Sequence, residues 1–278
     1  NCGYHMPIGG YYRLSLVLDH GSFRELDADL APQDVLHFPG YREKLAAAHV
    51  CVIGLGGVGS WCVEALARTG IGRLTLIDGD TVAESNINRQ LPALTSTLGR
   101  PKAEVLAARA ADINPEATIA AVTQFIDETS MERLIPADAL IVDAIDSLKV
   151  KTALIAWAHQ QGRFILVSGG AGGRTNPALV TAGDLARVTH DALLSKVRAG
   201  LRKHYGFPKG NAVPERSRPF GIRAVFSTEG ARPCAPDAAA EVGIEAGFGT
   251  SIVVTASVGL RLAAEMVQTI AALEEKAD

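Results

Sequence analysis

A glycine-rich turn is the first part of this sequence that could do chemistry. Residues 51–59 read Cys-Val-Ile-Gly-Leu-Gly-Gly-Val-Gly, so an apolar run enters the turn and a helical pattern of apolar residues leaves it. Gly54 permits a sharp turn, Gly56 lets the main chain approach a phosphate, and Gly59 lets the helix pack closely on the strand. The start of that helix offers unpaired N–H groups and a positive dipole to an anion. The sequence therefore predicts a nucleotide-phosphate site, which by itself fits both dehydrogenases and ATP-using enzymes.

Fixed charges further along the chain narrow that choice. Asp78 ends the next apolar run, where a carboxylate can accept hydrogen bonds from both ribose hydroxyls or serve as a turn residue. Residues 86–90 read Asn-Ile-Asn-Arg-Gln, and Lys102 follows them. Cleavage of ATP between its α and β phosphates builds negative charge that Arg89 and Lys102 could stabilise, although either residue alone could be a solvated surface charge. The set favours an ATP-cleaving enzyme over a nicotinamide-dependent dehydrogenase.

Two carboxylates close another apolar run, at residues 139–144. Asp143 and Asp146 would face the same edge of a sheet as the glycine turn. Because Mg²⁺ binds one or two carboxylates together with phosphate oxygens, a carboxylate here could hold the ion between phosphates. The alternative is that Asp146 or Ser147 caps the helix that follows, and one residue could do both.

The elements that must position these residues alternate between apolar runs and helical patterns. Such alternation predicts a doubly wound, Rossmann-like parallel sheet with ligands at the carboxyl ends of its strands. We expect strands at residues 50–53, 74–78, 118–122, 139–144 and 164–168, and helices at 60–69, 101–114, 150–161, 184–202 and 251–274. The chain thus divides into an atypical N-terminal extension (1–45), an ATP-binding core (46–170) and a substrate-binding region with a C-terminal helix (171–278).

Composition limits the classes of function. The 278 residues carry a net charge of −3, so a nucleic-acid site would have to be a local patch. The four cysteines form no Cys-x-x-Cys pair, which argues against a zinc ribbon or a disulfide scaffold and suits a reducing cytoplasm; Cys234 could be a nucleophile or an inert loop thiol. The uncharged stretch 246–260 is short for a membrane span. We therefore expect a buried or interfacial helix and a cytoplasmic protein, with weak membrane association through that helix as the alternative.

One local basic patch lies between residues 187 and 223, where basic side chains greatly outnumber acidic ones. Tyr205, Phe207 and Phe220 lie among them and could form a stacking platform for bases. This stretch is the best candidate for RNA contact, and the alternative is a solvated helix and loop. The candidate RNA-binding residues are Lys196, Arg198, Arg202, Lys203, Lys209, Arg216 and Arg218.

The chemistry-bearing residues together resemble the ThiF-like adenylation family of the ubiquitin-activating type. The shared motifs are Gly-Leu-Gly-Gly-Val-Gly-Ser at 54–60, Asp-Gly-Asp at 78–80, Asn-x-x-Arg-Gln at 86–90, Lys102 and Asp-x-x-Asp at 143–146. Over about residues 46–278 the chain resembles the tRNA threonylcarbamoyladenosine dehydratase branch, through motifs at 65–72, 143–147, 169–173, 205–210 and 225–229. The lack of Cys-x-x-Cys pairs favours this branch over the zinc-bearing activators of sulfur carriers.

The resemblance implies roles for individual residues in binding ATP and Mg²⁺. Arg89, Lys102 and Asp146 would be catalytic, and Asp146 would also be the metal ligand. The nucleotide would be bound by Gly54, Gly56, Gly57, Gly59, Asp78, Asp80, Asn86 and Gln90.

The implied reaction is the ATP-dependent dehydration of threonylcarbamoyladenosine in tRNA, a cyclisation through an acyl adenylate. The implied partners are that tRNA and a second copy of the chain, with a sulfur donor or relay protein as a further candidate. Two alternatives stay open. One is an adenylating activator of a sulfur-carrier or ubiquitin-like protein, and the other is a catalytically impaired nucleotide-binding chimera.

The first 45 residues do not resemble that family. Residues 1–6 and 18–30 resemble the acetyl-CoA carboxylase carboxyltransferase β subunit, in which such a stretch follows a four-cysteine zinc ribbon. Only Cys2 could correspond to one of the four zinc ligands of that ribbon, and one thiolate cannot make a tetrahedral zinc site. We expect an extension without activity of its own. Arg13 or Arg42 could replace the arginine that family members extend into a partner's ATP site.

Overall fold

The computed structural model describes residues 18–19, 40–232 and 249–273. The chain divides into two compact units, residues 1–39 and 40–278. The second unit carries the predicted nucleotide site, and it begins before the boundary at residue 46 that the sequence suggested, because Leu45 in helix α2 (Tyr41–Ala47) is buried in its core. Cys2, Arg13, Cys234 and the predicted loop at 231–243, beyond its first two residues, lie outside the described residues.

A seven-stranded sheet forms the centre of this unit, in the order β3-β2-β1-β4-β5-β7-β6. All neighbouring strands are parallel except β6 and β7. The order reverses between β1 and β4, as in a doubly wound Rossmann-like sheet, so the prediction of the fold class is confirmed. The strands are β1 (His49–Ile53), β2 (Arg73–Ile77), β3 (Thr118–Val122), β4 (Leu140–Asp143), β5 (Ile165–Ser168), β6 (Val180–Asp184) and β7 (Arg223–Ser227).

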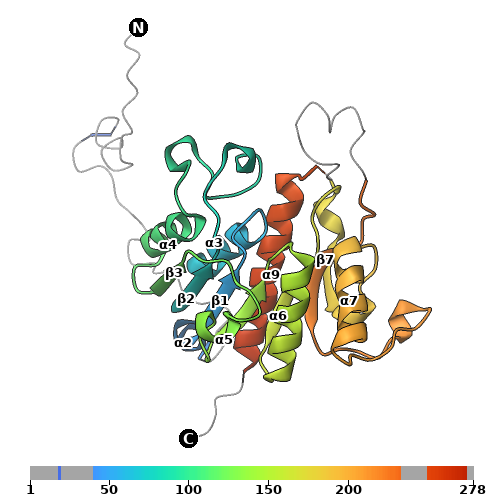
Figure 1. Cartoon of the computed structure of the whole chain (residues 1–278). Coiled ribbons are helices and arrows are strands. Elements are labelled where there is room, and N and C mark those ends of the chain that lie inside the picture. Colours follow the sequence, from blue (N-terminus) through green and yellow to red (C-terminus); the bar gives the residue numbers. More distant parts are fainter. Residues whose placement is uncertain (1–17, 20–39, 233–248, 274–278) are drawn as a thin grey trace, which may run out of the picture. The chain divides into compact units, whose positions relative to one another are not determined.

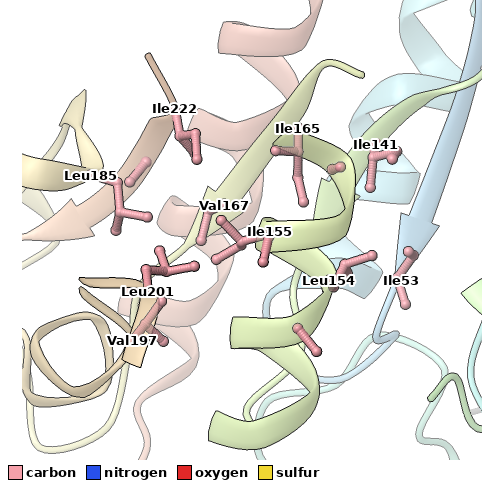
Figure 2. Close-up of a cluster of buried hydrophobic side chains, with 14 of the residues drawn as sticks. Ile53, Ile141, Leu154, Ile155, Ile165, Val167, Leu185, Val197, Leu201 and Ile222 are labelled. Atoms are coloured by element: carbon pink, nitrogen blue, oxygen red, sulfur yellow. The ribbon is translucent and has the colours of Figure 1, made fainter. Parts of the chain in front are cut away.

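Helices cover both faces of the sheet (Figure 1). Along β1, Val50 and Val52 pack on the face covered by α3, α4 and α9, whereas Cys51 and Ile53 pack on the face covered by α6 and α7. Figure 2 shows part of the second core, in which side chains of α6 and α7 meet those of β1, β4 and β5. Burial on both faces explains why the strands read as continuous apolar runs. The helices are α3 (Gly59–Thr69), α4 (Lys102–Ile113), α5 (Met131–Leu134), α6 (Leu148–Gln160), α7 (Ala192–His204) and α9 (Ile252–Ala272).

The helix predicted over residues 184–202 is partly wrong. The chain instead ends β6 at Asp184, makes a 3-10 turn at Leu185–Arg187 and begins α7 only at Ala192. Asp191 caps α7, because its side chain accepts a hydrogen bond from the main-chain N–H of Leu194. Strands β6 and β7 were not predicted either. Strand β6 contains a glycine and an aspartate within five residues and is half-buried along its whole length, so its sequence gives only a weak strand signal.

The C-terminal helix α9 packs along α3 and against the sheet end formed by β5, β7 and β6. A Cβ atom on Gly259 would collide with the main chain of α3's first turn, so this glycine permits the close approach. By length and composition α9 could cross a membrane, but 44% of its most apolar 18-residue stretch is buried inside the protein. The burial of Val254, Val258 and Leu262 agrees with the prediction of a buried helix.

Candidate active site

The loops at the carboxyl ends of β1, β2, β4 and β5 line one cavity of about 700 Å³. It lies where the strand order reverses, which is the expected place for a ligand in an open α/β sheet. Most predicted nucleotide-site residues line it: Gly54, Gly56, Gly57, Asp78, Asp80, Asn86, Arg89, Gln90, Lys102 and Asp146. Gly59 is the exception among them, because it is buried as the first residue of α3.

The glycines of the turn have different physical tasks. Gly54 has a φ of +86°, which favours glycine, and its N–H donates to the carbonyl of Ile77 at 2.9 Å. A Cβ atom on Gly59 would collide with the carbonyl oxygen of Gly54, so Gly59 serves helix packing. A Cβ atom on Gly56 would meet nothing closer than the Gln90 side chain at 3.7 Å. Gly56 therefore leaves open space for a ligand.

Asp78 is held in place by main-chain donors from two loops. Its Oδ2 accepts a hydrogen bond from the N–H of Leu55 at 2.7 Å, and its Oδ1 accepts one from the N–H of Asp80 at 2.8 Å. Each oxygen keeps a further lone pair, so the carboxylate can still accept from hydroxyl groups. Next to it, Gly79 packs against Phe125, a cavity-lining aromatic side chain that is 71% exposed and that was not predicted from the sequence.

The two predicted cations occupy different environments. Lys102 is only 5% exposed, and its Nζ lies 2.9 Å from Oδ2 of Asp80, so it is not a solvated surface charge. The guanidinium of Arg89 donates to the carbonyl of Ser85 at 2.9 Å and to Oδ1 of Asn88 at 2.8 Å. These contacts use one of its nitrogens, and the remaining donors are available to a bound anion.

The two amide residues predicted to bind the nucleotide, Asn86 and Gln90, also differ. Oδ1 of Asn86 accepts the main-chain N–H of Ala83 at 3.0 Å, so its side chain helps to fold the segment. Oε1 of Gln90 is buried and has no hydrogen-bond partner among the described residues. A buried polar atom without a partner is costly, so a ligand or water that donates to Gln90 would be favourable.

The structure separates the roles of the two carboxylates at the carboxyl end of β4. Asp143 is fully buried and lies 2.9 Å from Nζ of the equally buried Lys151, so it is inaccessible to a ligand. Burial raises the pKa of Asp143, and the charge of Lys151 opposes that effect. Asp146 is exposed and lines the cavity. Ser147 occupies the N-cap position of α6 without a side-chain hydrogen bond, so neither predicted cap interaction is present.

The buried pair fixes the segment that leads to Asp146. Oδ1 of Asp143 accepts the main-chain N–H of Ile145 at 3.0 Å, and Nζ of Lys151 donates to the carbonyl of Ile145 at 2.9 Å. The N–H and the carbonyl of Ile145, the residue before Asp146, are therefore both held by the ion pair. Lys151 was not predicted as a site residue, although a lysine within an otherwise apolar helix face, eight residues after a strand-ending aspartate, is a usable signal.

The donors present fit Mg²⁺ only together with phosphates. Among residues 40–232 and 249–273 no group of three or more His, Cys, Asp or Glu side chains could hold a metal ion. Among the cavity-lining carboxylates, Asp78 accepts two main-chain hydrogen bonds and Asp80 pairs with Lys102, which leaves Asp146 as the candidate ligand. One or two carboxylates match the way Mg²⁺ is commonly bound, since the ion takes most of its ligands from water and substrate phosphates.

The basic patch is only partly as predicted. Lys196, Lys203, Lys209, Arg216 and Arg218 are exposed, whereas Arg198 and Arg202 are half-buried. Burial and the neighbouring charge of Arg202 lower the pKa of Arg198.

The predicted stacking platform is wrong for two of its three aromatic residues. Phe207 and Phe220 are 7% and 6% exposed, and their rings pack against each other with centroids 4.9 Å apart. Arg202 lies over the Phe220 ring at 5.3 Å, so it covers this apolar pair. Only Tyr205, at 36% exposure, could still stack on a base.

Comparison with known proteins gives consistent matches along the chain. A model described as the ThiF family matches residues 27–277. The tRNA threonylcarbamoyladenosine dehydratase of Haemophilus influenzae is 43% identical over 231 residues, which is 81% of this chain and 86% of that protein. The crystal structures of Escherichia coli tRNA N6-threonylcarbamoyladenosine dehydratase, TcdA, in complex with ATP and with AMP match with TM-scores of 0.74 and 0.75, at 36% and 37% identity. Each match covers 84% of this chain and 90% of the other.

Proposed function

The chain belongs to the ThiF family, and we propose that it uses ATP to dehydrate and cyclise threonylcarbamoyladenosine in tRNA. The observation that carries this proposal is the convergence of the glycine turn, Asp78, Arg89, Lys102 and Asp146 on one cavity. Its relatives named for this activity include the Haemophilus influenzae dehydratase, and TcdA of Escherichia coli has been crystallised with ATP and with AMP.

The proposed reaction has two steps. A carboxylate oxygen of the threonylcarbamoyl side chain attacks the α-phosphorus of ATP, which forms an acyl–phosphate bond and releases pyrophosphate. A nucleophilic atom of the same side chain then attacks the acyl carbon, loses its proton, displaces AMP and closes a ring. The substrate loses one water overall, and the two atoms that join are already close, which lowers the barrier of the second step.

The residues of the cavity suit the charges of the first step. Asp78 binds the ribose, and the main chain at Gly56 and Gly57 approaches the phosphates. The guanidinium of Arg89 and the ammonium of Lys102 stabilise the charge that develops on the α-phosphoryl oxygens and on pyrophosphate. Asp146 would hold Mg²⁺, which when bound neutralises phosphate charge.

The partners remain part of the proposal. The exposed lysines and arginines of α7 and the following loop suit the phosphates of tRNA. Large apolar side chains are exposed on α9 (Ile252, Val253 and Leu260) and on the segment after β2 (Ile87 and Leu94), and such side chains are typical of an interface, which supports a homodimer. A cytoplasmic location and a sulfur donor or relay protein stay predictions of the sequence.

A single assay tests the function. The protein is incubated with ATP, Mg²⁺ and tRNA carrying threonylcarbamoyladenosine, and AMP release is measured together with the mass of the modified nucleoside. We expect one AMP for each nucleoside that loses the mass of one water. ATP–pyrophosphate exchange that requires a small carrier protein, with none for tRNA, would instead identify an activator of a sulfur-carrier or ubiquitin-like protein.

A carboxylate variant tests the assignment of Asp146. Asp146→Asn removes the charge at the cavity, so we expect AMP formation to fall by roughly 100-fold or more while tRNA binding is kept. The matched control is Glu116→Gln. It removes an exposed carboxylate just before the amino end of β3, whereas the cavity lies at the carboxyl ends of the strands. Unchanged turnover of Asp146→Asn would exclude the proposed role.

A further inference from the structure

A second buried ion pair lies beside the cavity and is not used by the mechanism above. Arg174 and Asp191 are 3% and 4% exposed, and Nη2 of Arg174 lies 3.5 Å from Oδ2 of Asp191. Charged side chains are rarely buried so completely unless they are paired and hydrogen-bonded, because removal from water is costly. The remaining contacts of the pair therefore indicate what it holds.

Both side chains hold the main chain of Gly170, in the glycine-rich loop after β5. Oδ2 of Asp191 accepts the N–H of Gly170 at 2.9 Å, and Nη1 of Arg174 donates to the carbonyl of Gly170. A Cβ atom on Gly169 would collide with Oδ2 of Asp191, so the loop lies directly against the carboxylate.

The same pair connects this loop to the start of α7. Oδ1 of Asp191 accepts the N–H of Leu194 at 2.8 Å and so caps the helix. Arg174 also donates to the carbonyls of His190 at 2.8 Å and Glu229 at 3.0 Å. His190 has a φ of 57°, which is uncommon for a residue other than glycine, so the surrounding contacts hold this turn in a costly conformation.

The loop that the pair holds lines a part of the cavity where no predicted nucleotide-binding residue lies. Residues 168–172 and Leu193 line it, and all of the loop residues are small. No hydrogen-bond acceptor among the described residues is paired with the main-chain N–H of Ala171 or Gly172. A wall of small residues in which these N–H groups have no partner in the described part of the chain suits a substrate that carries a carboxylate.

We propose that Arg174 and Asp191 are positioning residues for the acceptor side of the cavity, the part that binds the substrate whose carboxylate accepts the adenylyl group. Together they fix Gly170 and thereby hold residues 169–172 as a preformed wall against which the carboxylate substrate binds beside the α-phosphate. Fully paired buried networks of this kind rigidify a structure. The inference rests on the proposed function, because it assigns the acceptor half of the same cavity.

Variants can separate loop positioning from helix capping and from folding. Asp191→Ser keeps an N-cap oxygen for α7 but loses the reach to Gly170. The double variant Asp191→Ser, Arg174→Met also removes the unpaired charge, so we expect it to unfold at a higher urea concentration than either single variant. Arg174→Lys keeps the positive charge but lacks the planar guanidinium that donates to three carbonyls. This variant replaces the others in the measurements if they fail to fold.

Two measurements then decide the proposal. By hydrogen exchange with mass spectrometry, amides of residues 169–173 should exchange about tenfold or more faster in the double variant, while those of β1 and α9 keep their rates. With modified tRNA, kcat/KM should fall roughly 10- to 100-fold, chiefly through KM, while the Kd for ATP stays within about twofold of the wild-type value. The control is Glu64→Gln, Arg109→Met, which removes an ion pair between α3 and α4 away from the cavity.

Each outcome has a definite meaning. Unchanged exchange at residues 169–173 overturns the proposal, and so does faster exchange with an unchanged KM for tRNA. If the wild-type protein converts no modified tRNA, the proposed function fails by itself. The exchange rates then still decide whether the pair anchors the loop.

Discussion

Lys151 and Asp143 form an ion pair at 2.9 Å in which neither side chain has any exposed surface. The aspartate accepts the N–H of Ile145 and the lysine donates to its carbonyl, so one residue of the loop is held from both sides. Asp191 and Arg174 hold Gly170 in the same manner. Two neighbouring strands, β4 and β5, are thus each followed by a cavity-lining loop whose main chain is fixed by a buried pair of opposite charges.

Removing one partner of the first pair should strongly destabilise the protein. Lys151→Met leaves the buried Asp143 without its partner, and we expect a loss of about 3–5 kcal/mol in the free energy of unfolding. Asp143→Asn, Lys151→Met removes both charges and should lose less than Lys151→Met alone. Urea denaturation followed by circular dichroism measures both, and a loss below about 1 kcal/mol in Lys151→Met would contradict the structural importance of the pair.

Two glycines of the turn should respond differently to the same substitution. Gly59→Ala places a methyl group against the carbonyl of Gly54, so we expect a low yield of folded protein or a much lower melting temperature. Gly56→Ala has room in the folded chain but fills ligand space, so it should keep the wild-type melting temperature and bind ATP roughly tenfold or more weakly. Thermal unfolding and calorimetric titration test the pair. Equal losses of melting temperature in the two variants would contradict the assignment of Gly59 to helix packing and Gly56 to ligand space.

Stability at low pH should depend on Glu64. Hydrogen bonds from Arg109 and then Arg68 lower the pKa of Glu64 below its ordinary value of 4.5. The folded chain therefore binds this proton less readily than the unfolded chain, so the stabilisation is present above about pH 4.5 and is lost as the pH falls through the lowered pKa. Glu64→Gln should be less stable than wild type at pH 7, and the difference should shrink as the pH falls below about 4.5. A difference that grows at low pH would reverse the assigned sign.

Charge on α7 should control the salt dependence of tRNA binding. Lys196 and Lys203 are exposed, so Lys196→Glu, Lys203→Glu should weaken binding and reduce the slope of log K against log salt concentration by roughly one for each lost phosphate contact. Filter binding over a salt series measures the slope, and ATP affinity should be unchanged. Arg100→Glu, an exposed cation on the segment before α4, provides the control. If both variants lower the slope equally, α7 is not the tRNA-binding surface.

The sequence by itself determined the doubly wound sheet, because strands buried on both faces and the helices between them leave a local pattern. It also predicted most of the residues that line the cavity, since the carboxyl ends of parallel strands meet at one edge. Gly54, Asp78, Lys102 and Asp146 are far apart in the chain but follow or adjoin those ends.

The tertiary structure alone decided which charges face the cavity and which are buried. Asp143 and Asp146 are equivalent in the sequence pattern, yet one is paired with Lys151 in the core and the other lines the cavity. The pairing of Arg174 with Asp191, and the position of β7 between β5 and β6, also depend on contacts between distant segments. The local order of residues does not encode such contacts, because burial and partner are set only when the layers pack together.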